Sequence, residues 1–274
     1  TLVYIKSEGD IDLHTPLYEM GVQGVFTRSL DAALLSGKID IAVHSMKDVP
    51  TQLAKGIQQA AVLKRASPFD ILVYKKDISF LENAGSAATI ATSSIRRKAQ
   101  WLNKYPAHNL VNLRGNVNTR LKKLDDSDWQ GAIFAAAGLE RINLRPANSI
   151  ELDWMLPAPA QGAIMVVCRQ EDEVSFRSAG LLNDADTAAC VKVERDFLRT
   201  LLGGCSTPIS AYATIEGDKM NFQGNILSLD GKLKKEVESI IPVSEAKDLG
   251  INMALQLLKE GGQAIADSIR NAGK

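Results

Sequence analysis

The stretch "TIATSSIRRKAQWLNKYP", residues 89–106, changes its pattern partway along. Residues 89–94 form a short run of the kind found in buried strands, and residues 95–106 read as a helical segment. A strand that leads directly into a helix is the unit from which open parallel sheets are built. The stretch therefore predicts an α/β fold.

Two later stretches repeat this unit. "NLVNLRG" at 109–115 leads into "NVNTRLKKL" at 116–124, and "GAIFAAAG" at 131–138 leads into "LERINL" at 139–144. Three such units between about residue 70 and residue 158 fit one doubly wound domain.

An earlier strand and helix predict a first domain of the same kind. A helical pattern that starts at Thr15 and Pro16 ends at Gly37, and the strand "IDIAVHS" follows at 39–45. The Pro-rich stretch at 154–170 then leads into a strand that we expect to return to this first sheet.

The pattern changes from residue 184 onward. Residues 184–204 predict one long helix with Gly203 or Gly204 as its C-cap, and Ser244 is placed to cap a last amphipathic helix through Leu258. Three antiparallel segments separated by turn signals lie between these helices, near residues 208–216, 219–228 and 232–240.

The 274 residues are enough for two or three domains. We expect two doubly wound α/β domains and a small C-terminal α+β domain with a three-stranded antiparallel sheet. The expected boundaries are 1–66 with 162–182 for domain 1, 70–158 for domain 2, and 185–274 for the C-terminal domain.

The overall composition excludes several classes of protein. With 45% apolar and 23% charged residues, the chain is typical of a globular protein, and thirty-two basic residues balance thirty-two acidic ones. No net charge therefore attracts it to nucleic acid or to a membrane surface. No run approaches the roughly 18 apolar residues of a membrane span, and residues 1–20 do not resemble a signal peptide, so we expect a cytoplasmic protein.

Arginines recur where the predicted strands end and the helices begin. A cation at a helix N-terminus is unfavourable by roughly 0.3–1 kcal/mol unless an anion lies beside it. Solvated ion pairs would explain any single arginine as well as carboxylate or phosphate binding does. For the group we favour a polyanion site, and we expect the charges of Arg97 and Arg114 to face carboxylates of the ligand and not partners in the core. The residues are Arg96, Arg97, Arg114, Arg120 and Arg141, with hydroxyl donors expected from Ser45, Thr92, Ser93 and Ser94.

Asp48 is a lone acid among these bases. It follows the strand at 39–45 and has Lys47 beside it, so it is a candidate for a catalytic or cation-stabilising carboxylate. The plainer interpretation is an exposed ion pair with Lys47, which contributes little. His44, inside the strand pattern, is interpreted as a hydrogen-bonded core histidine.

The three cysteines have neither CxxC spacing nor a histidine pattern, which argues against a disulfide framework and a zinc site. Cys168 and Cys190 fall in apolar patterns and are predicted to be buried. Cys205 follows the glycine pair in "LLGGCSTPI", and from spacing alone it is either a loop cysteine without a role or an attachment point for a prosthetic group. A hydrolytic thiolate is disfavoured, because the negative end of the preceding helix opposes ionisation and no paired histidine is visible.

Six stretches together resemble the successive signatures of the hydroxymethylbilane synthase family, also called porphobilinogen deaminases. The resemblance runs from about Gly9 to Pro208 and weakens in the last domain. The stretches are "GVFTRSLDAALLSGKIDIAVHSMKDVPT", "ATSSIRRKAQ", "LRGNVNTRL", "AAAGLERI", "LPAPAQGAI" and "LLGGCSTPI".

The resemblance implies two hinged domains of the periplasmic-binding-protein type and a dipyrromethane cofactor bound covalently through Cys205. It implies a monomer, without a metal, that condenses four porphobilinogen molecules head to tail and releases hydroxymethylbilane. Asp48 would be the catalytic residue. The implied contacts of the cofactor and of the growing pyrrole oligomer add Phe26, Lys47, Gly115, Asn116 and Gln161 to the arginines and hydroxyl residues named above.

The chain also departs from the family pattern. Family members begin with a further segment of roughly 40 residues, which here is either truncated or not given. We expect domain 1 to show an incomplete sheet edge or an exposed apolar groove as a result. The alternative function is a non-enzymatic two-domain solute-binding protein for small anions, and a cysteine hydrolase is a third that lacks a base.

Overall fold

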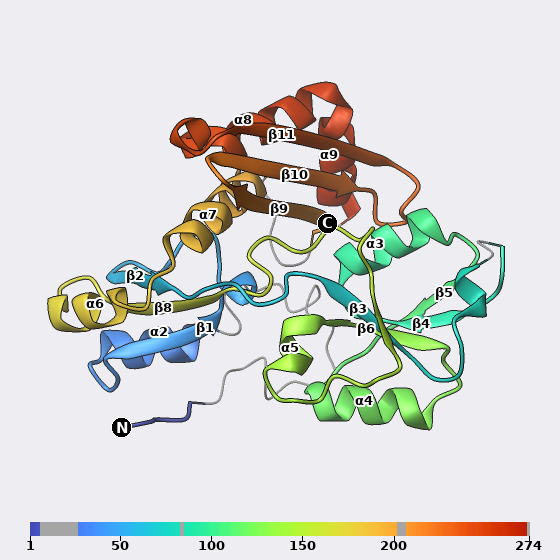
Figure 1. Ribbon diagram of the computed structural model, residues 1–274, viewed down its shortest axis with the longest axis horizontal. Coiled ribbons are helices and arrows are strands. Elements are labelled where there is room, and N and C mark those ends of the chain that lie inside the picture. Colours follow the sequence, from blue (N-terminus) through green and yellow to red (C-terminus); the bar gives the residue numbers. More distant parts are fainter. Residues whose placement is uncertain (6–26, 83–84, 202–206, 273–274) are drawn as a thin grey trace.

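The computed structural model describes residues 1–5, 27–82, 85–201 and 207–272. These residues form three sheets, each with its own helices (Figure 1). Two α/β units lie side by side, and the third sheet lies above them with its helices. The predicted α/β class and the three-stranded C-terminal sheet are confirmed.

The first sheet has the strand order β1-β8-β2. Strand β8 pairs antiparallel with both neighbours, so β1 and β2 run in the same direction. The expected return of the chain from residues 154–170 to the first sheet is therefore confirmed. The strands are β1 (Ile41–Ser45), β2 (Ile57–Val62) and β8 (Ile164–Arg169), and the helices beside them are α2 (Arg28–Leu35) and α6 (Glu173–Gly180).

Strand β1 lies at the edge of this sheet in the described part of the chain. Its residues alternate, so that Ala42 and His44 are buried while Ile41 and Val43 are 44% and 57% exposed. Two apolar side chains of this strand are therefore accessible among the described residues. The predicted helix start at Thr15 and Pro16 lies outside the described residues.

The second sheet has the order β5-β4-β6-β3-β7, with β4 parallel to β5 and β6, and β3 antiparallel to β6 and β7. The three predicted strand–helix units are present, but the third helix lies at 136–140 and not at the predicted 139–144. The antiparallel β3 and the short β7 were not predicted. The elements are β3 (Asp70–Tyr74), β4 (Thr89–Ala91), α3 (Ile95–Lys104), β5 (Asn109–Val111), α4 (Val117–Asp126), β6 (Gly131–Ala135), α5 (Ala136–Glu140) and β7 (Ser149–Glu151).

Both faces of this second sheet are buried. Ile71 and Val73 of β3 pack in one core with Leu124 of α4, and Leu72 packs in another with Trp101 of α3. Because side chains alternate between the faces of a strand, a sheet covered on both sides needs apolar residues at successive positions. That requirement explains the unbroken apolar run that follows the first residue of β3.

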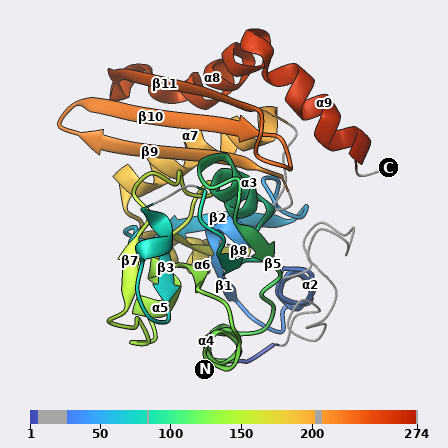
Figure 2. The same cartoon turned by 90° about the vertical axis from the view of Figure 1, so that its right-hand side faces the viewer.

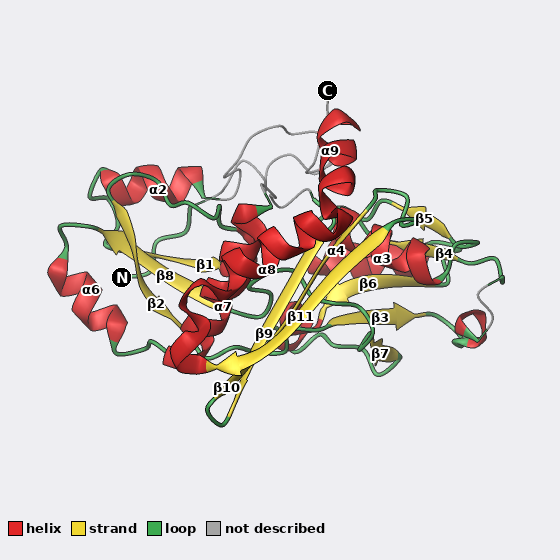
Figure 3. Ribbon diagram, turned by 90° about the horizontal axis from the view of Figure 1, so that it is seen from above, coloured by secondary structure: helices red, strands yellow, loops and turns green. Residues whose placement is uncertain are grey.

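The third sheet is an antiparallel meander with three helices against it (Figures 2 and 3). Phe197 of α7 packs on Phe222 of β10, with ring centroids 5.3 Å apart. The predicted cap at Ser244 is wrong, because a 3₁₀ turn covers Val243–Asp248 before the helix begins. The elements are α7 (Ala185–Thr200), β9 (Ile209–Glu216), β10 (Lys219–Leu227), β11 (Lys234–Pro242), α8 (Leu249–Leu257) and α9 (Gln263–Ala272), with a π-helical kink at Leu258–Gly262 between the last two.

The C-terminal unit contacts both α/β units. Gln100 of α3 donates to the Ser210 hydroxyl at 3.1 Å, and Glu194 of α7 pairs with Arg65, which precedes β3, at 2.5 Å. Helix α7 thus joins the third sheet to the segment that connects the other two. None of the helices described in this structure is long and apolar enough to cross a bilayer.

Candidate functional site

Two of the predicted arginines share a buried carboxylate. The guanidinium of Arg96 donates to Asp70 at 2.6 Å, and Arg97 donates to Asp70 from Nε at 3.0 Å and from Nη2 at 2.7 Å. Asp70 is fully buried, and the two arginines are 5% and 7% exposed. Burial by itself would raise the pKa of Asp70, but the two guanidinium groups outweigh it and hold that pKa well below 3.8.

This arrangement corrects one expectation from the sequence. Arg96 and Arg97 do occupy the first turn of α3, as predicted, but the anion that offsets their charge is Asp70 of the protein itself. For Arg97, the expectation that its charge has no partner in the core is wrong. Asp70 was missed, although a carboxylate at the start of an apolar strand is a signal of a buried ion pair.

Gln161 links this buried cluster to Lys47. Its amide nitrogen donates to Asp70 at 2.8 Å and to the Pro68 carbonyl at 2.7 Å, while its carbonyl oxygen accepts from Lys47 at 3.2 Å. Gln161 is 1% exposed. Both hydrogens of its amide are used inside the protein, so Gln161 connects Lys47 to the arginine pair and has no hydrogen left to donate to a ligand.

The Lys47 ammonium is poorly solvated and lies in a mixed electrostatic field. Burial lowers its pKa to about 8, with Arg97 acting in the same direction and Asp48 and Asp70 opposing it. The side chain is half-buried. Lys47 therefore loses its proton more readily than an exposed lysine.

The predicted hydroxyl donors mostly serve the backbone. Ser93 donates to the Leu113 carbonyl at 2.7 Å and accepts from the Leu113 amide at 2.9 Å, so its hydroxyl bridges to the end of the neighbouring strand. Ser94 caps α3 by accepting from the Arg97 amide, and Thr92 accepts from the Ser94 amide. Within the described residues no hydrogen bond of the Ser45 hydroxyl is found.

Residues 114–120 bring further cations to the same region. Gly115 has a φ of +115°, which favours glycine, and Asn116 caps α4 by accepting from the Thr119 amide at 2.9 Å. Arg120 donates to the Gly115 carbonyl at 2.6 Å. Burial lowers the pKa of Arg120, and the charges of Arg97 and Arg114 lower it further while Asp48 opposes them. These interactions place the positive charges close together, with Asp48 near them.

Asp48 differs from the other carboxylate of this region. It ends a 3₁₀ turn, Met46–Asp48, directly after β1, and it is half-buried. Among the residues that the structure describes, its carboxylate takes part in no hydrogen bond or ion pair. No ion pair between Asp48 and Lys47 is found among the described residues, where the Lys47 ammonium donates to Gln161, although the charge of Asp48 raises the pKa of Lys47. His44, predicted to be a core residue, is 8% exposed, and burial lowers its pKa although Asp31 and Asp48 oppose this.

Arg141 contacts the backbone directly after Gln161. It is exposed at the end of α5 and donates to the Gly162 carbonyl at 2.6 Å. Arg65, which the sequence interpretation missed, donates to the Gln161 carbonyl at 2.8 Å and pairs with Glu194. Glu194 also accepts from the amides of Ala160 and Ala213, at 2.6 and 2.8 Å. Three side chains, those of Arg65, Arg141 and Glu194, therefore form hydrogen bonds to the backbone at residues 160–162.

The predictions for the cysteines have separate outcomes. Cys168 and Cys190 are buried, as predicted, and burial together with Glu194 raises the pKa of Cys190 to about 12. Such a thiol stays protonated and unreactive near neutral pH. Cys205 and Phe26 lie outside the described residues, as do Gly203 and Gly204.

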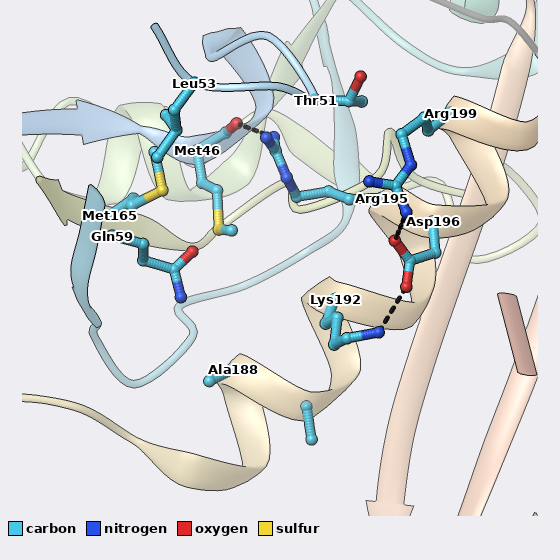
Figure 4. Close-up of a pocket in the computed structure, with 11 residues that line it drawn as sticks. Met46, Thr51, Leu53, Gln59, Met165, Ala188, Lys192, Arg195, Asp196 and Arg199 are labelled. Carbon is cyan, nitrogen blue, oxygen red and sulfur yellow. Dashed lines mark hydrogen bonds and ion pairs between the residues drawn. The ribbon is translucent and has the colours of Figure 1, made fainter. Parts of the chain in front are cut away.

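A cavity of about 430 Å³ lies between α7 and the loop that follows Asp48 (Figure 4). Met46 and Met165 lie on one side of it, and Lys192, Arg195 and Arg199 of α7 lie on the other. None of the binding residues predicted from the sequence lines this cavity. The candidate site is the group of Asp48, Lys47, Arg114 and Arg120, and none of these residues lines the cavity.

The charges of this region match a ligand that carries both carboxylates and a cation. Lys47, Arg114 and Arg120 supply positive charge, and Asp48 supplies a carboxylate with no partner among the described residues. A dipyrrole with an acetate and a propionate on each ring fits such a donor set, because its carboxylates match the cations. Pyrrole N–H groups and a cationic carbon match the carboxylate.

Two family models match the chain. "Porphobilinogen deaminase, dipyromethane cofactor binding domain" matches residues 1–176, and "Porphobilinogen deaminase, C-terminal domain" matches residues 188–259.

Curated relatives have the same name. The porphobilinogen deaminase of Pelobacter propionicus is 38% identical over 98% of this chain and 87% of its own length, and that of Trichlorobacter lovleyi is 39% identical over 98% and 86%. That of Syntrophotalea carbinolica is 40% identical over 96% and 84%.

Similar solved structures include an ancestral cationic amino acid solute-binding protein, with 14% identity, a TM-score of 0.39 and coverage of 56% of this chain and 65% of that one. The periplasmic VFT2 domain of BvgS from Bordetella pertussis has 15% identity, a TM-score of 0.34 and coverage of 56% and 65%.

Proposed function

The chain belongs to the porphobilinogen deaminase family, and from this premise we propose that Asp48 is its catalytic carboxylate and that Cys205 carries the cofactor. The reaction is that of a hydroxymethylbilane synthase, a transferase of tetrapyrrole and haem biosynthesis. Four porphobilinogen molecules are joined head to tail, each joining step releases one ammonia, and one water is consumed when the tetrapyrrole is set free as hydroxymethylbilane. The dipyrromethane of this family supplies the α-carbon to which the first substrate is joined.

The observation that carries the proposal is the environment of Asp48. It is a half-buried carboxylate without a partner among the described residues, and it influences the pKa of Lys47, of Arg120 and of His44. The Asp70 carboxylate, by contrast, accepts hydrogen bonds from both arginines of α3 and from Gln161. The carboxylate at residue 48 is therefore the one available to a ligand in this region of the described structure.

Asp48 has a role in each part of the joining step. Loss of ammonia from the aminomethyl group of porphobilinogen leaves a cationic methylene-pyrrole, and a nearby carboxylate stabilises that cation. The same oxygen atoms can hold the pyrrole N–H and relay the proton released when the new carbon–carbon bond forms. Lys47, Arg114 and Arg120 bind the acetate and propionate groups and so hold the growing oligomer in place.

Several finer assignments belong to the same proposal. Arg96, Arg97 and Gln161 act by holding Lys47 and the start of α3 in position. We assign domain 1 to residues 1–66 with 162–182, domain 2 to 70–158 and the C-terminal domain to 185–274. Three separate sheets with their own cores support these limits. The enzyme is proposed to be a cytoplasmic monomer that binds no nucleic acid. Light scattering on the purified holoprotein tests its oligomeric state.

Two measurements test the chemical assignment. Intact-protein mass spectrometry should find an increment of two condensed pyrroles, located on the peptide with Cys205 and lost in Cys205→Ala. An adduct on another peptide would overturn the attachment site. Single-turnover ammonia release should then be almost abolished in Asp48→Asn and measurable in Asp48→Glu, with cofactor attached in both. An Asn variant near the parent rate would exclude Asp48 as the catalytic carboxylate.

A further inference from the structure

Helix α7 holds the loop that carries Asp48 through one arginine. Nη1 of Arg195 donates to the carbonyl of Met46 at 3.2 Å and to that of Val49 at 3.0 Å, and Nη2 donates to the carbonyl of Pro50 at 2.6 Å. Figure 4 shows the Arg195 side chain extending from the helix to the Met46 carbonyl. The three acceptors lie on either side of Lys47 and Asp48.

The loop at residues 46–50 needs such a support because its own backbone amides form few hydrogen bonds. The Met46 amide donates to Ala163 at 3.0 Å, and the Val49 amide closes the single 3₁₀ turn at 3.2 Å. Pro50 has no amide hydrogen to donate. A guanidinium group presents several N–H donors in a rigid plane, so one side chain can fix three carbonyl oxygens at once.

The helix end of this contact is itself fixed. Arg195 follows Glu194, which is fully buried and accepts hydrogen bonds from Arg65 and from the amides of Ala160 and Ala213. The same helix ends at Thr200, shortly before Cys205 in the sequence. One rigid element thus contacts the loop of Asp48 and leads into the segment that contains Cys205.

We propose that Arg195 is a positioning residue for the joining reaction, which acts by holding the carbonyls on either side of Asp48 and so sets where the Asp48 carboxylate stands. The inference rests on the proposed role of Asp48. It assigns to the C-terminal unit a part in catalysis that is separate from cofactor attachment. A displacement of about 1 Å at a reacting group can lower a rate by about a hundredfold, so the expected loss is large for a residue that does not touch the substrate.

The test uses the cofactor-loaded enzyme and two substitutions. Arg195→Gln removes the positive charge and the planar set of guanidinium donors. Arg195→Lys keeps the charge, but its single ammonium group cannot bond to all three carbonyls together. Arg199→Gln is the matched control, because Arg199 lies one helical turn away, lines the same cavity and pairs with Asp196 at 2.8 Å instead of with the loop. Mass spectrometry and thermal melting first establish cofactor content and folding for each variant. If Arg195→Gln does not fold, Arg195→Lys carries the measurements.

The expected result is a fall in kcat of roughly 10- to 100-fold in Arg195→Gln with KM for porphobilinogen nearly unchanged, and a smaller fall in Arg195→Lys. Amide hydrogen exchange should rise in the peptide that contains residues 46–50. Arg199→Gln should match the parent enzyme in all three measurements. A parent-like kcat in Arg195→Gln would overturn the inference.

A double-mutant cycle with Asp48→Asn separates positioning from general structural damage. If Arg195 acts through Asp48, Arg195→Gln should slow the Asp48→Asn enzyme by less than twofold. An additive loss in that background would overturn the inference and leave the role of Asp48 intact. If Asp48→Asn itself keeps the parent rate, the proposed function fails at Asp48 and the inference fails with it.

Discussion

Replacing Asp70 by asparagine removes an anion that two buried guanidinium groups share. The carboxylate accepts four hydrogen bonds, three from Arg96 and Arg97 and one from Gln161, with donor–acceptor distances of 2.6–3.0 Å. Removing one partner of a buried ion pair costs about 3–5 kcal/mol, because the remaining charge is left without compensation. At roughly 2–4 °C per kcal/mol, the melting temperature should fall by about 6–20 °C. The asparagine oxygen can still accept, which favours the lower part of this range.

The sign of the pH dependence follows from the direction of the pKa shift. The folded-state pKa of Asp70 lies below its ordinary value of 3.8, so its contribution is fully present above that pH and is lost as the pH falls through the folded-state value. The difference in the free energy of unfolding between the parent protein and Asp70→Asn should therefore stay constant from pH 6 to 8 and become smaller only in strong acid.

Thermal and urea unfolding of both proteins at several pH values provide the measurement. Asp126→Asn is the matched control, because Asp126 pairs with Lys122 at 3.6 Å on the surface and its loss should cost less than about 0.5 kcal/mol. A cost for Asp70→Asn no larger than that of the control would refute the conclusion that Asp70 stabilises the two arginines.

Three further predictions concern other parts of the chain. The part of the porphobilinogen affinity that depends on Lys47 should decline as the pH rises through about 8, where the ammonium loses its proton. The KM for porphobilinogen should therefore rise with pH in the parent enzyme and change less in Lys47→Arg; parallel KM profiles in the two enzymes would contradict this prediction. Gly224→Ala should destabilise the protein by about 1–3 kcal/mol, because its new Cβ would lie 2.6 Å from the Phe197 ring, whereas Gly138→Ala in α5 has open space and should be neutral or stabilising by up to about 1 kcal/mol; equal urea midpoints would exclude this. Cys190→Ala should cost roughly 1 kcal/mol in urea unfolding and leave the cofactor attached, and Cys190 in the native parent should resist alkylation at pH 8; rapid labelling would show that it is accessible.

Local patterns in the sequence determined the elements of this protein and much of their order. The runs at 89–94, 109–115 and 131–138 each contain a parallel strand that leads into a helix, because strand and helix periodicity depend on neighbouring residues. In the third run the helix already begins at Ala136. Family motifs in consistent order identified the reaction, and they did so without any knowledge of which side chains touch.

The last part of the chain shows the limit of such local patterns. Ser244 has the chemistry of a cap, but a 3₁₀ turn holds it and the helix begins at Leu249. The second helix, Gln263–Ala272, was not predicted. Start signals are short and common, so packing on the third sheet decides which of them is used.

Only the tertiary structure decided which charges are partners. Arg97 and Asp70 are 27 residues apart, Lys47 and Gln161 are 114 apart, and Met46 and Arg195 are 149 apart. A basic side chain at a helix start has the same local pattern whether it faces a ligand or a buried carboxylate. The difference lies in how the first residue of β3 and the turn before β8 approach α3, and that approach is set by the packing of whole sheets and helices. The sequence therefore supplied the charged groups, and the fold assigned Asp70 to the arginines while leaving Asp48 available.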